Sequence, residues 1–194
     1  MPTLRQARLE FFQAAGFPLD GGYDDDFSEA EFGPVLYRVR NTEARREALE
    51  RHDLHHLVTG YATDWKGEAE ISAWELASGF GRTPYAWIIM LWGLFTGLVG
   101  NLGPTFEAFV RGRGSTNLYT EDIDDTLLNS TVEDLRARLR VRPQGELSVD
   151  VLVGFAAWSV AALAWGLVAI PAVALYVLSA STPRCFSCPR CLEA

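Results

Sequence analysis

A run of thirty residues near the C-terminus carries no charged side chain, and any fold of this chain has to accommodate it. Residues 151–180 read VLVGFAAWSVAALAWGLVAIPAVALYVLSA. A membrane-spanning helix needs about 20 apolar residues, so the run is long enough for one span and too short for two spans joined by a turn. We predict one transmembrane helix, tilted or kinked near Pro171. The alternative is a buried hairpin in a soluble core.

Arginines flank this run in two unequal groups. The larger group precedes it and the smaller follows it, as Arg136, Arg138, Arg140 and Arg142 and then Arg184 and Arg190. Basic residues favour the cytoplasmic side of a membrane. We therefore expect a single-pass protein of an inner membrane, cytoplasmic or mitochondrial, with the main domain on the cytoplasmic or matrix side.

All three cysteines lie in the tail that follows the run, residues 181–194, with the spacing C-x2-C-x2-C. They are Cys185, Cys188 and Cys191. Three thiolates can bind a metal or part of an iron–sulfur cluster, although a fourth ligand is missing. Acylation and disulfide pairing are the alternatives. Without cysteines, the rest of the chain is neither a disulfide scaffold nor a cysteine enzyme.

Residues 1–145 have the pattern of an all-α domain. Helical periodicity predicts helices at residues 3–16, 42–59, 64–80, 85–100 and 131–141. The expected end signals, in chain order, are Asn41 or Thr42, Gly60, Thr63 or Asp64, and a capping box of Ser130 with Glu133. Residues 17–34 look like a loop, and no convincing alternating strand is evident.

The helix predicted at residues 85–100 is strongly apolar but too short for a safe membrane span. We expect a buried helix or one wall of an apolar cavity. Gly93 and Gly97 are four residues apart, which lets another backbone or a chain-like ligand come close. A core helix with incidental glycines is the simpler alternative.

The three histidines of the chain are concentrated in one helix, together with an aspartate. His52 and His56 are four residues apart and therefore share a helix face, and Asp53 flanks that face. A following antiparallel helix would bring Glu68 opposite them. Two histidines and two carboxylates suit zinc, iron(II), manganese or cobalt, without choosing among them. His55 can replace His56 as a ligand.

Each of these residues also has a purely structural explanation. The histidines can be surface residues, and Asp53 can pair with Arg51 or Arg46. Glu68, near a helix N-terminus, is favourable for the helix dipole alone. A metallohydrolase is a further alternative, because zincin proteases use H-E-x-x-H; here Asp53 would have to act as the base.

The stretch HDLHH, eleven further residues and Glu68 fit the pattern H-D-x-x-H-x11-E. This pattern resembles the metal motif of the fourth Coq protein family of coenzyme Q (ubiquinone) biosynthesis. Three sequence segments around and after the motif are similar to the same family: HDLHHLVTGYATDWKGEAEISAWELASG, AFVRGRG and LYTEDIDDTLLNSTVEDLRARL. The resemblance covers about residues 35–141. The uncharged run, the cysteine tail and the short N-terminal part are not part of the family pattern.

The resemblance implies an all-helical, membrane-associated protein with an apolar tunnel for a polyprenyl tail. It implies a divalent metal held at the ring end of the lipid by the residues matching His52, Asp53, His56 and Glu68, with Asp53 also catalytic. It further implies oxidative decarboxylation, with hydroxylation at ring carbon C1, of a prenylated 4-hydroxybenzoate-type precursor.

The leading hypothesis is therefore a metal-dependent enzyme of quinone biosynthesis. The alternatives are a non-catalytic prenyl-lipid scaffold and a metallohydrolase. The expected partners are a polyprenyl aromatic lipid, the membrane and other quinone-biosynthesis enzymes. Formation of a homo-oligomer is left open. A net charge of −8 leaves no basic surface for nucleic acid.

Overall fold

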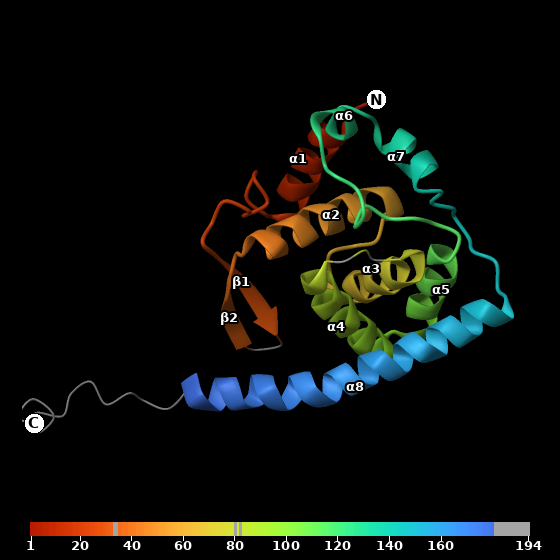
Figure 1. Ribbon diagram of the computed structural model, residues 1–194. Coiled ribbons are helices and arrows are strands. Elements are labelled where there is room, and N and C mark those ends of the chain that lie inside the picture. Colours follow the sequence, from red (N-terminus) through yellow and green to blue (C-terminus); the bar gives the residue numbers. More distant parts are fainter. Residues whose placement is uncertain (33–34, 80, 82, 181–194) are drawn as a thin grey trace, which may run out of the picture.

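The computed structural model describes residues 1–32, 35–79, 81 and 83–180 (Figure 1). This part of the chain contains eight helices and one short hairpin, so the prediction of an all-α fold is confirmed. The elements are α1 (Leu4–Ala15), β1 (Phe27–Phe32), β2 (Val35–Arg40), α2 (Glu43–Thr59), α3 (Trp65–Ser78), α4 (Pro84–Gly100), α5 (Leu102–Gly112), α6 (Asp125–Leu128), α7 (Val132–Arg138) and α8 (Val149–Ala180). The three cysteines, and any metal site they form, lie outside the described residues.

Most helices begin at a side-chain cap. Thr42 accepts a hydrogen bond from the backbone N–H of Arg45 at the start of α2, and Gly60 ends that helix with a positive φ of 79°. The capping box of α7 is shifted by one residue from the prediction. Thr131 and Asp134 form it, because the Ser130 hydroxyl donates instead to the carbonyl of Leu127.

The hairpin corrects the prediction that residues 17–34 are a loop and that no strand occurs. β1 and β2 pair antiparallel, from Phe27 opposite Arg40 to Phe32 opposite Val35. Asn41 anchors the base of the hairpin, since its side chain donates to the carbonyl of Gly22 and its backbone N–H to that of Asp26. The strands gain their hydrogen bonds from each other, so the signal in each strand alone is weak.

Helix α3 lies at the centre of the larger core cluster, packed against α4 and α5. The side chains that fill this cluster are apolar and almost fully buried, and include Trp74, Leu76, Met90, Leu94 and Phe109. A second cluster joins α1, α2 and α7 through Leu4, Leu54, Val58, Leu135 and Leu139. Helix α2 therefore has one face in this second cluster and another toward α3.

The two glycines of α4 allow close helix packing. A Cβ atom on Gly93 would lie 2.0 Å from the Ser72 hydroxyl of α3, and one on Gly97 would lie 2.5 Å from the Thr105 hydroxyl of α5. Protein therefore occupies the space beside both glycines. The lipid tunnel expected along this helix stays a prediction.

Helix α8 is one continuous helix that passes through Pro171, so the alternative of a buried hairpin is wrong. Its segment Val149–Ala172 has a mean hydropathy of 2.0, and only 17% of the most apolar window is buried. A core helix of a soluble protein is mostly buried. Within the described residues, α8 is the one helix long and apolar enough to cross a membrane.

Candidate metal centre

Helix α2 places two of its histidines on a single buried face. His52 and His56 are one helical turn apart and are 4% and 3% exposed. Their rings meet edge to face, with the ring centroids 4.8 Å apart. The ring of Phe11, from α1, stacks on His56 with a centroid separation of 5.7 Å and covers it from the outside.

Helix α3 folds back and brings Glu68 to the two histidines. Asp64 caps α3 by accepting hydrogen bonds from the backbone N–H groups of Lys66 and Gly67. The turn before α3 is so tight that a Cβ on Gly67 would lie 2.0 Å from the carbonyl oxygen of Ala62. A glycine is therefore required here, and it places Glu68 in the first turn of α3 facing α2.

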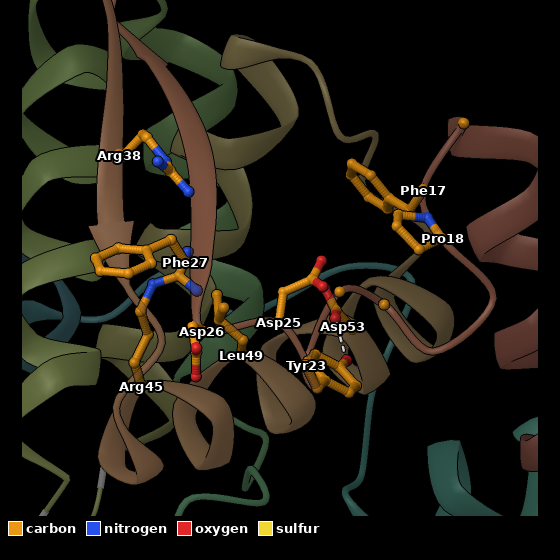
Figure 2. A pocket seen from close by; sticks show the side chains of 13 residues that line it. Phe17, Pro18, Tyr23, Asp25, Asp26, Phe27, Arg38, Arg45, Leu49 and Asp53 are labelled. Carbon is orange, nitrogen blue, oxygen red and sulfur yellow. Dashed lines mark hydrogen bonds between the residues drawn. The ribbon is translucent and has the colours of Figure 1, made fainter.

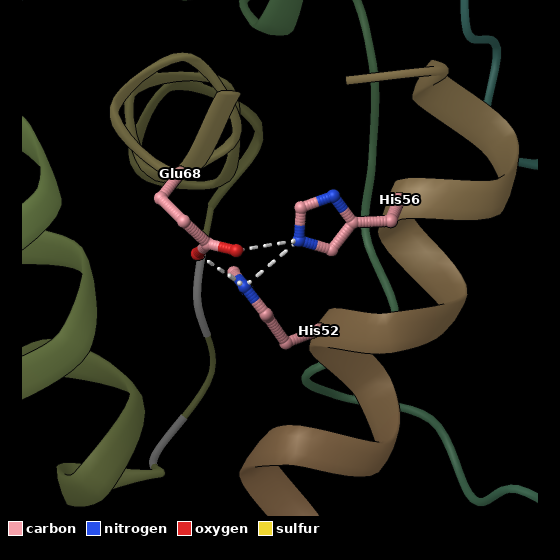
Figure 3. A group of neighbouring side chains, drawn as sticks. All are labelled: His52, His56 and Glu68. Carbon is pink, nitrogen blue, oxygen red and sulfur yellow. Dashed lines mark hydrogen bonds and ion pairs between the residues drawn. The ribbon is translucent and has the colours of Figure 1, made fainter. Parts of the chain in front are cut away.

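The three side chains converge on one small volume (Figure 3). Glu68 reaches His52 with one oxygen, Oε2 to Nε2 at 3.1 Å, and His56 with the other, Oε1 to Nε2 at 3.3 Å. The two Nε2 atoms lie 3.2 Å apart. One donor atom from each of the three residues can be chosen so that all lie within 4.8 Å of one another. The predicted metal site is therefore present as a group of three candidate ligands.

Outer contacts fix the tautomers of both histidines. The Nδ1–H group of His52 donates to Oε1 of Glu75 at 2.9 Å, and that of His56 donates to the carbonyl of Tyr61 at 3.0 Å. Carboxylates and carbonyls only accept, so Nδ1 carries a proton in each ring. The two Nε2 atoms face each other at 3.2 Å, close enough for a cation or a proton between them to relieve their repulsion. This is the orientation that metal-ligating histidines adopt.

Glu75 is the centre of the supporting network. It is completely buried, and its Oε1 accepts hydrogen bonds from His52, His55 and Tyr119 at 2.9, 2.7 and 3.0 Å. Its Oε2 has no hydrogen-bond partner among the described residues. Burial alone would raise the pKa of Glu75, but the charge and hydrogen bond of His52, with the hydrogen bond of His55, lower it well below the ordinary value. Glu75 is therefore a buried anion.

His55 belongs to this network and not to the ligand group. Its Nδ1–H donates to Glu75, and its Nε2 accepts the backbone N–H of Leu118 at 2.9 Å. Both ring nitrogens are therefore occupied by protein, and burial lowers the pKa of the ring. His55 is thus a neutral structural histidine, and the alternative in which it replaces His56 as a ligand has no free nitrogen to support it.

The charges of the ligand group match those of a cation site. Burial lowers the pKa of His52, but Glu75 and Glu68 on either side outweigh it and raise that pKa well above 6.5. Burial likewise raises the pKa of Glu68, while the hydrogen bonds and charges of His52 and His56 lower it to about 2. In the absence of a metal, a proton shared near His52 balances the two carboxylates. A divalent cation would displace that proton.

Asp53, which the sequence predicts as a ligand and as the catalytic residue, is oriented differently. Its Oδ2 accepts a hydrogen bond from the Tyr23 hydroxyl, and the residue lies outside the three-residue group. It lines a cleft of about 1030 Å³ between α2 and the segment that leads into β1 (Figure 2). Burial raises the pKa of Asp53, opposed by His52. Asp53 thus lies beside the ligand group and faces the cleft.

The sequence predictions missed the supporting residues. Glu75 lies seven residues after Glu68, two helical turns along α3, and this spacing is the one signal that could have paired it with α2. Tyr61 contributes a backbone carbonyl, which any residue type provides. Tyr119 lies in the segment after α5, so nothing local connects it with the histidines.

No protein-family model matches the chain, no curated protein matches it, and no solved structure matches it. The resemblance to the Coq family therefore stays a prediction.

Proposed function

We propose that this protein is a metal-dependent enzyme that acts on a prenylated aromatic acid at a membrane. The reaction we favour is the oxidative decarboxylation, with hydroxylation at ring carbon C1, of a 4-hydroxybenzoate-type precursor of ubiquinone. The observation that carries the proposal is the donor set itself: two histidine Nε2 atoms and one carboxylate that converge from two helices.

This donor set supports oxidative chemistry for a coordination reason. Two histidines and one carboxylate fill one side of a metal ion and leave positions open for other ligands, as in the iron(II) oxygenases. Zinc, manganese and cobalt also fit these donors. A bound metal would supply open positions that orient the ring carboxylate and admit dioxygen. The ionised Glu68 and the buried anion Glu75 would then balance the charge of a divalent cation.

The reaction needs an external reductant. One atom of dioxygen enters the ring as the new hydroxyl and the other leaves as water, while the ring carboxyl leaves as carbon dioxide. Two electrons and two protons complete this balance, and a two-electron donor must supply the electrons. The donor is a further partner of the protein under this proposal.

Helix α8 supports the choice of a lipid substrate. A polyprenyl chain keeps an aromatic acid in the bilayer, and an enzyme for it must reach the membrane surface. An apolar helix that is long enough to cross the bilayer provides that attachment.

The test compares Glu68→Gln with Glu70→Gln in the full chain purified in detergent. Both variants remove one carboxylate charge from α3, but Glu70 bonds Asn101 and lies outside the ligand group. We expect the wild type and Glu70→Gln to hold near-stoichiometric metal and to release carbon dioxide from a short-chain prenylated 4-hydroxybenzoate supplied with dioxygen and a reductant. Glu68→Gln should lose both properties.

Three results would contradict the proposal in different ways. Equal metal content in both variants would remove Glu68 from the ligand set. Metal binding without turnover in the wild type, together with retained lipid binding, would support the alternative of a prenyl-lipid scaffold. Hydrolysis of an ester or amide analogue by the wild type would support the metallohydrolase instead.

A further inference from the structure

Helices α4 and α8 lie side by side and run in the same direction. The rings of Trp87 and Trp158 meet edge to face with centroids 6.0 Å apart. Eight residues further along each helix, Gly166 lies against the ring of Phe95, where a Cβ atom would be 2.5 Å from the ring. The equal spacing of these contacts sets the register, so the end of α4 at Gly100 lies level with about residue 171 of α8.

The part of α8 beyond α4 is too short to cross a membrane. It comprises residues 172–180, and nine residues of α-helix extend about 14 Å. The hydrocarbon core of a bilayer is about 30 Å thick. If α8 crosses a membrane while packed as it is here, the span must include the section beside α4.

Both helices present apolar side chains outward along that section. On α4 and the start of α5, the exposed apolar residues are Trp87, Ile88, Val99 and Leu102. On α8 they include Val153, Val160, Leu167 and Val168, of which Leu167 is 78% exposed. Residues 83–106, which contain the whole of α4, carry no charge. An exposed apolar surface of this extent on two neighbouring helices is costly in water and favourable in lipid.

Basic groups gather where α8 begins. The Arg111 guanidinium donates to the carbonyl of Arg142, the Ser115 hydroxyl donates to the carbonyl of Arg140, and Arg113 pairs with Asp150 at 3.2 Å. Four arginines, Arg111, Arg113, Arg140 and Arg142, therefore belong to segments that meet at this end of the apolar surface, where Asp150 and Glu146 pair with two of them. An excess of basic over acidic groups favours contact with anionic lipid headgroups.

We propose that α4 and α8 lie together in the lipid bilayer, so that the domain is partly immersed in the membrane instead of being tethered to it by α8. The beginning of α8 lies at the headgroups, and both helices then enter the hydrocarbon region. The backbone carbonyl of Glu68 is 3.0 Å from the position of a Cβ on Gly93 of α4. Helix α3, which carries Glu68 of the candidate ligand group, therefore packs directly against the helix that we place in lipid.

Spin labels on single cysteines test the immersion of α4. The labels are placed on the full chain with the three tail cysteines replaced by serine, in vesicles of phosphatidylcholine and phosphatidylglycerol. Ile88→Cys and Val99→Cys report on α4, and Leu167→Cys on α8. Ala137→Cys is the water-side control, because Ala137 is exposed on α7, which lies across the domain from α8 (Figure 1). Collisions with oxygen report lipid, and collisions with a water-soluble nickel complex report water.

We expect the labels at positions 88, 99 and 167 to favour oxygen and the label at position 137 to favour nickel. If the labels at positions 88 and 99 favour nickel while the label at position 167 favours oxygen, the proposal is overturned and α8 is a simple tether. Nickel preference at all four positions would overturn it as well.

A cross-link tests whether the two helices stay together in the vesicle. Trp87→Cys combined with Trp158→Cys should be joined by a short bifunctional thiol reagent in vesicles as efficiently as in detergent. The loss of this cross-link in vesicles would mean that α8 leaves the domain on insertion, and it would contradict the paired arrangement whatever the depth of α4.

Discussion

Helix α2 carries histidines in two different environments within one turn of each other. His55 is enclosed by protein, with one ring nitrogen donating to Glu75 and the other accepting from the backbone of Leu118. His52 and His56 each have one nitrogen held by protein, while the other points at Glu68. The same residue type is thus structural in one case and a candidate ligand in the other two.

The number of occupied ring nitrogens makes this difference. A neutral imidazole has one donor and one acceptor, and a metal can bind only through an unprotonated nitrogen. Where protein uses both nitrogens, none is left for a ligand. Glu75 connects the two environments, because its Oε1 orients His52 and holds His55 at the same time.

The largest expected effect comes from His52→Ala, which removes a ligand and a partner of Glu75 together. We expect the loss of metal affinity to exceed the roughly 10- to 100-fold loss that follows when a residue hydrogen-bonded to a metal ligand is mutated. Metal content by mass spectrometry and affinity by competition with a chelator measure it. Metal retained at the wild-type level would remove His52 from the ligand set.

A smaller loss is expected for Glu75→Gln. The amide removes the negative charge that fixes the Nδ1–H tautomer of His52, so metal affinity should fall by roughly 10- to 100-fold. Glu70→Gln is the matched control, since it makes the same change in the same helix at a half-buried residue that bonds Asn101 and lies outside the ligand group. Equal affinities in the two variants would mean that Glu75 supports only the fold.

As the pH decreases, the affinity for metal should also fall about tenfold per pH unit over the range in which His52 is protonated, because each bound metal displaces one proton. The pKa of His52 is raised above 6.5, so the fall should begin above that pH. The stability of the metal-free protein should change with pH in the opposite direction. Protonated His52 stabilises the folded state below pH 6.5, and this stabilisation is lost as the pH rises through the raised pKa. An affinity that is constant down to pH 6.5 would contradict the raised pKa.

His55→Ala should affect stability much more than metal binding. The variant leaves a cavity and an unpaired Leu118 N–H group, and we expect it to lower the free energy of unfolding by about 3 kcal/mol. Chemical unfolding of the metal-free protein in detergent measures this. Metal affinity should change by less than in Glu75→Gln. A complete loss of metal from a folded His55→Ala protein would break the distinction between the two environments.

The smallest effect on metal is expected for Asp53→Asn. The carboxylate bonds Tyr23 and lies outside the ligand group, so the variant should keep the metal content of the wild type. If turnover falls while metal is retained, Asp53 acts from the cleft on the substrate. A loss of metal would instead make Asp53 a fourth ligand, as the sequence pattern predicts.

Features that depend on residues a few positions apart can be recognised from the chain alone. Gly60 ends α2, the starts of α2 and α3 are predicted to within one residue of Thr42 and Asp64, and the four-residue spacing of His52 and His56 places them on one face. The thirty uncharged residues of α8 are long enough for a span in any context. Capping, helical periodicity and apolar length act locally, so they can be recognised without knowing the fold.

Which distant groups meet depends instead on how the whole helices pack. It brought Glu75 of α3 and the backbone of Leu118 to the histidines, and it turned Asp53 toward Tyr23. Contacts such as that between Leu118 and His55, which are 63 residues apart, follow from how whole helices pack and leave no local trace. The pairing of α4 with α8 has the same origin, because α8 covers apolar surface that the packing of α3, α4 and α5 leaves uncovered.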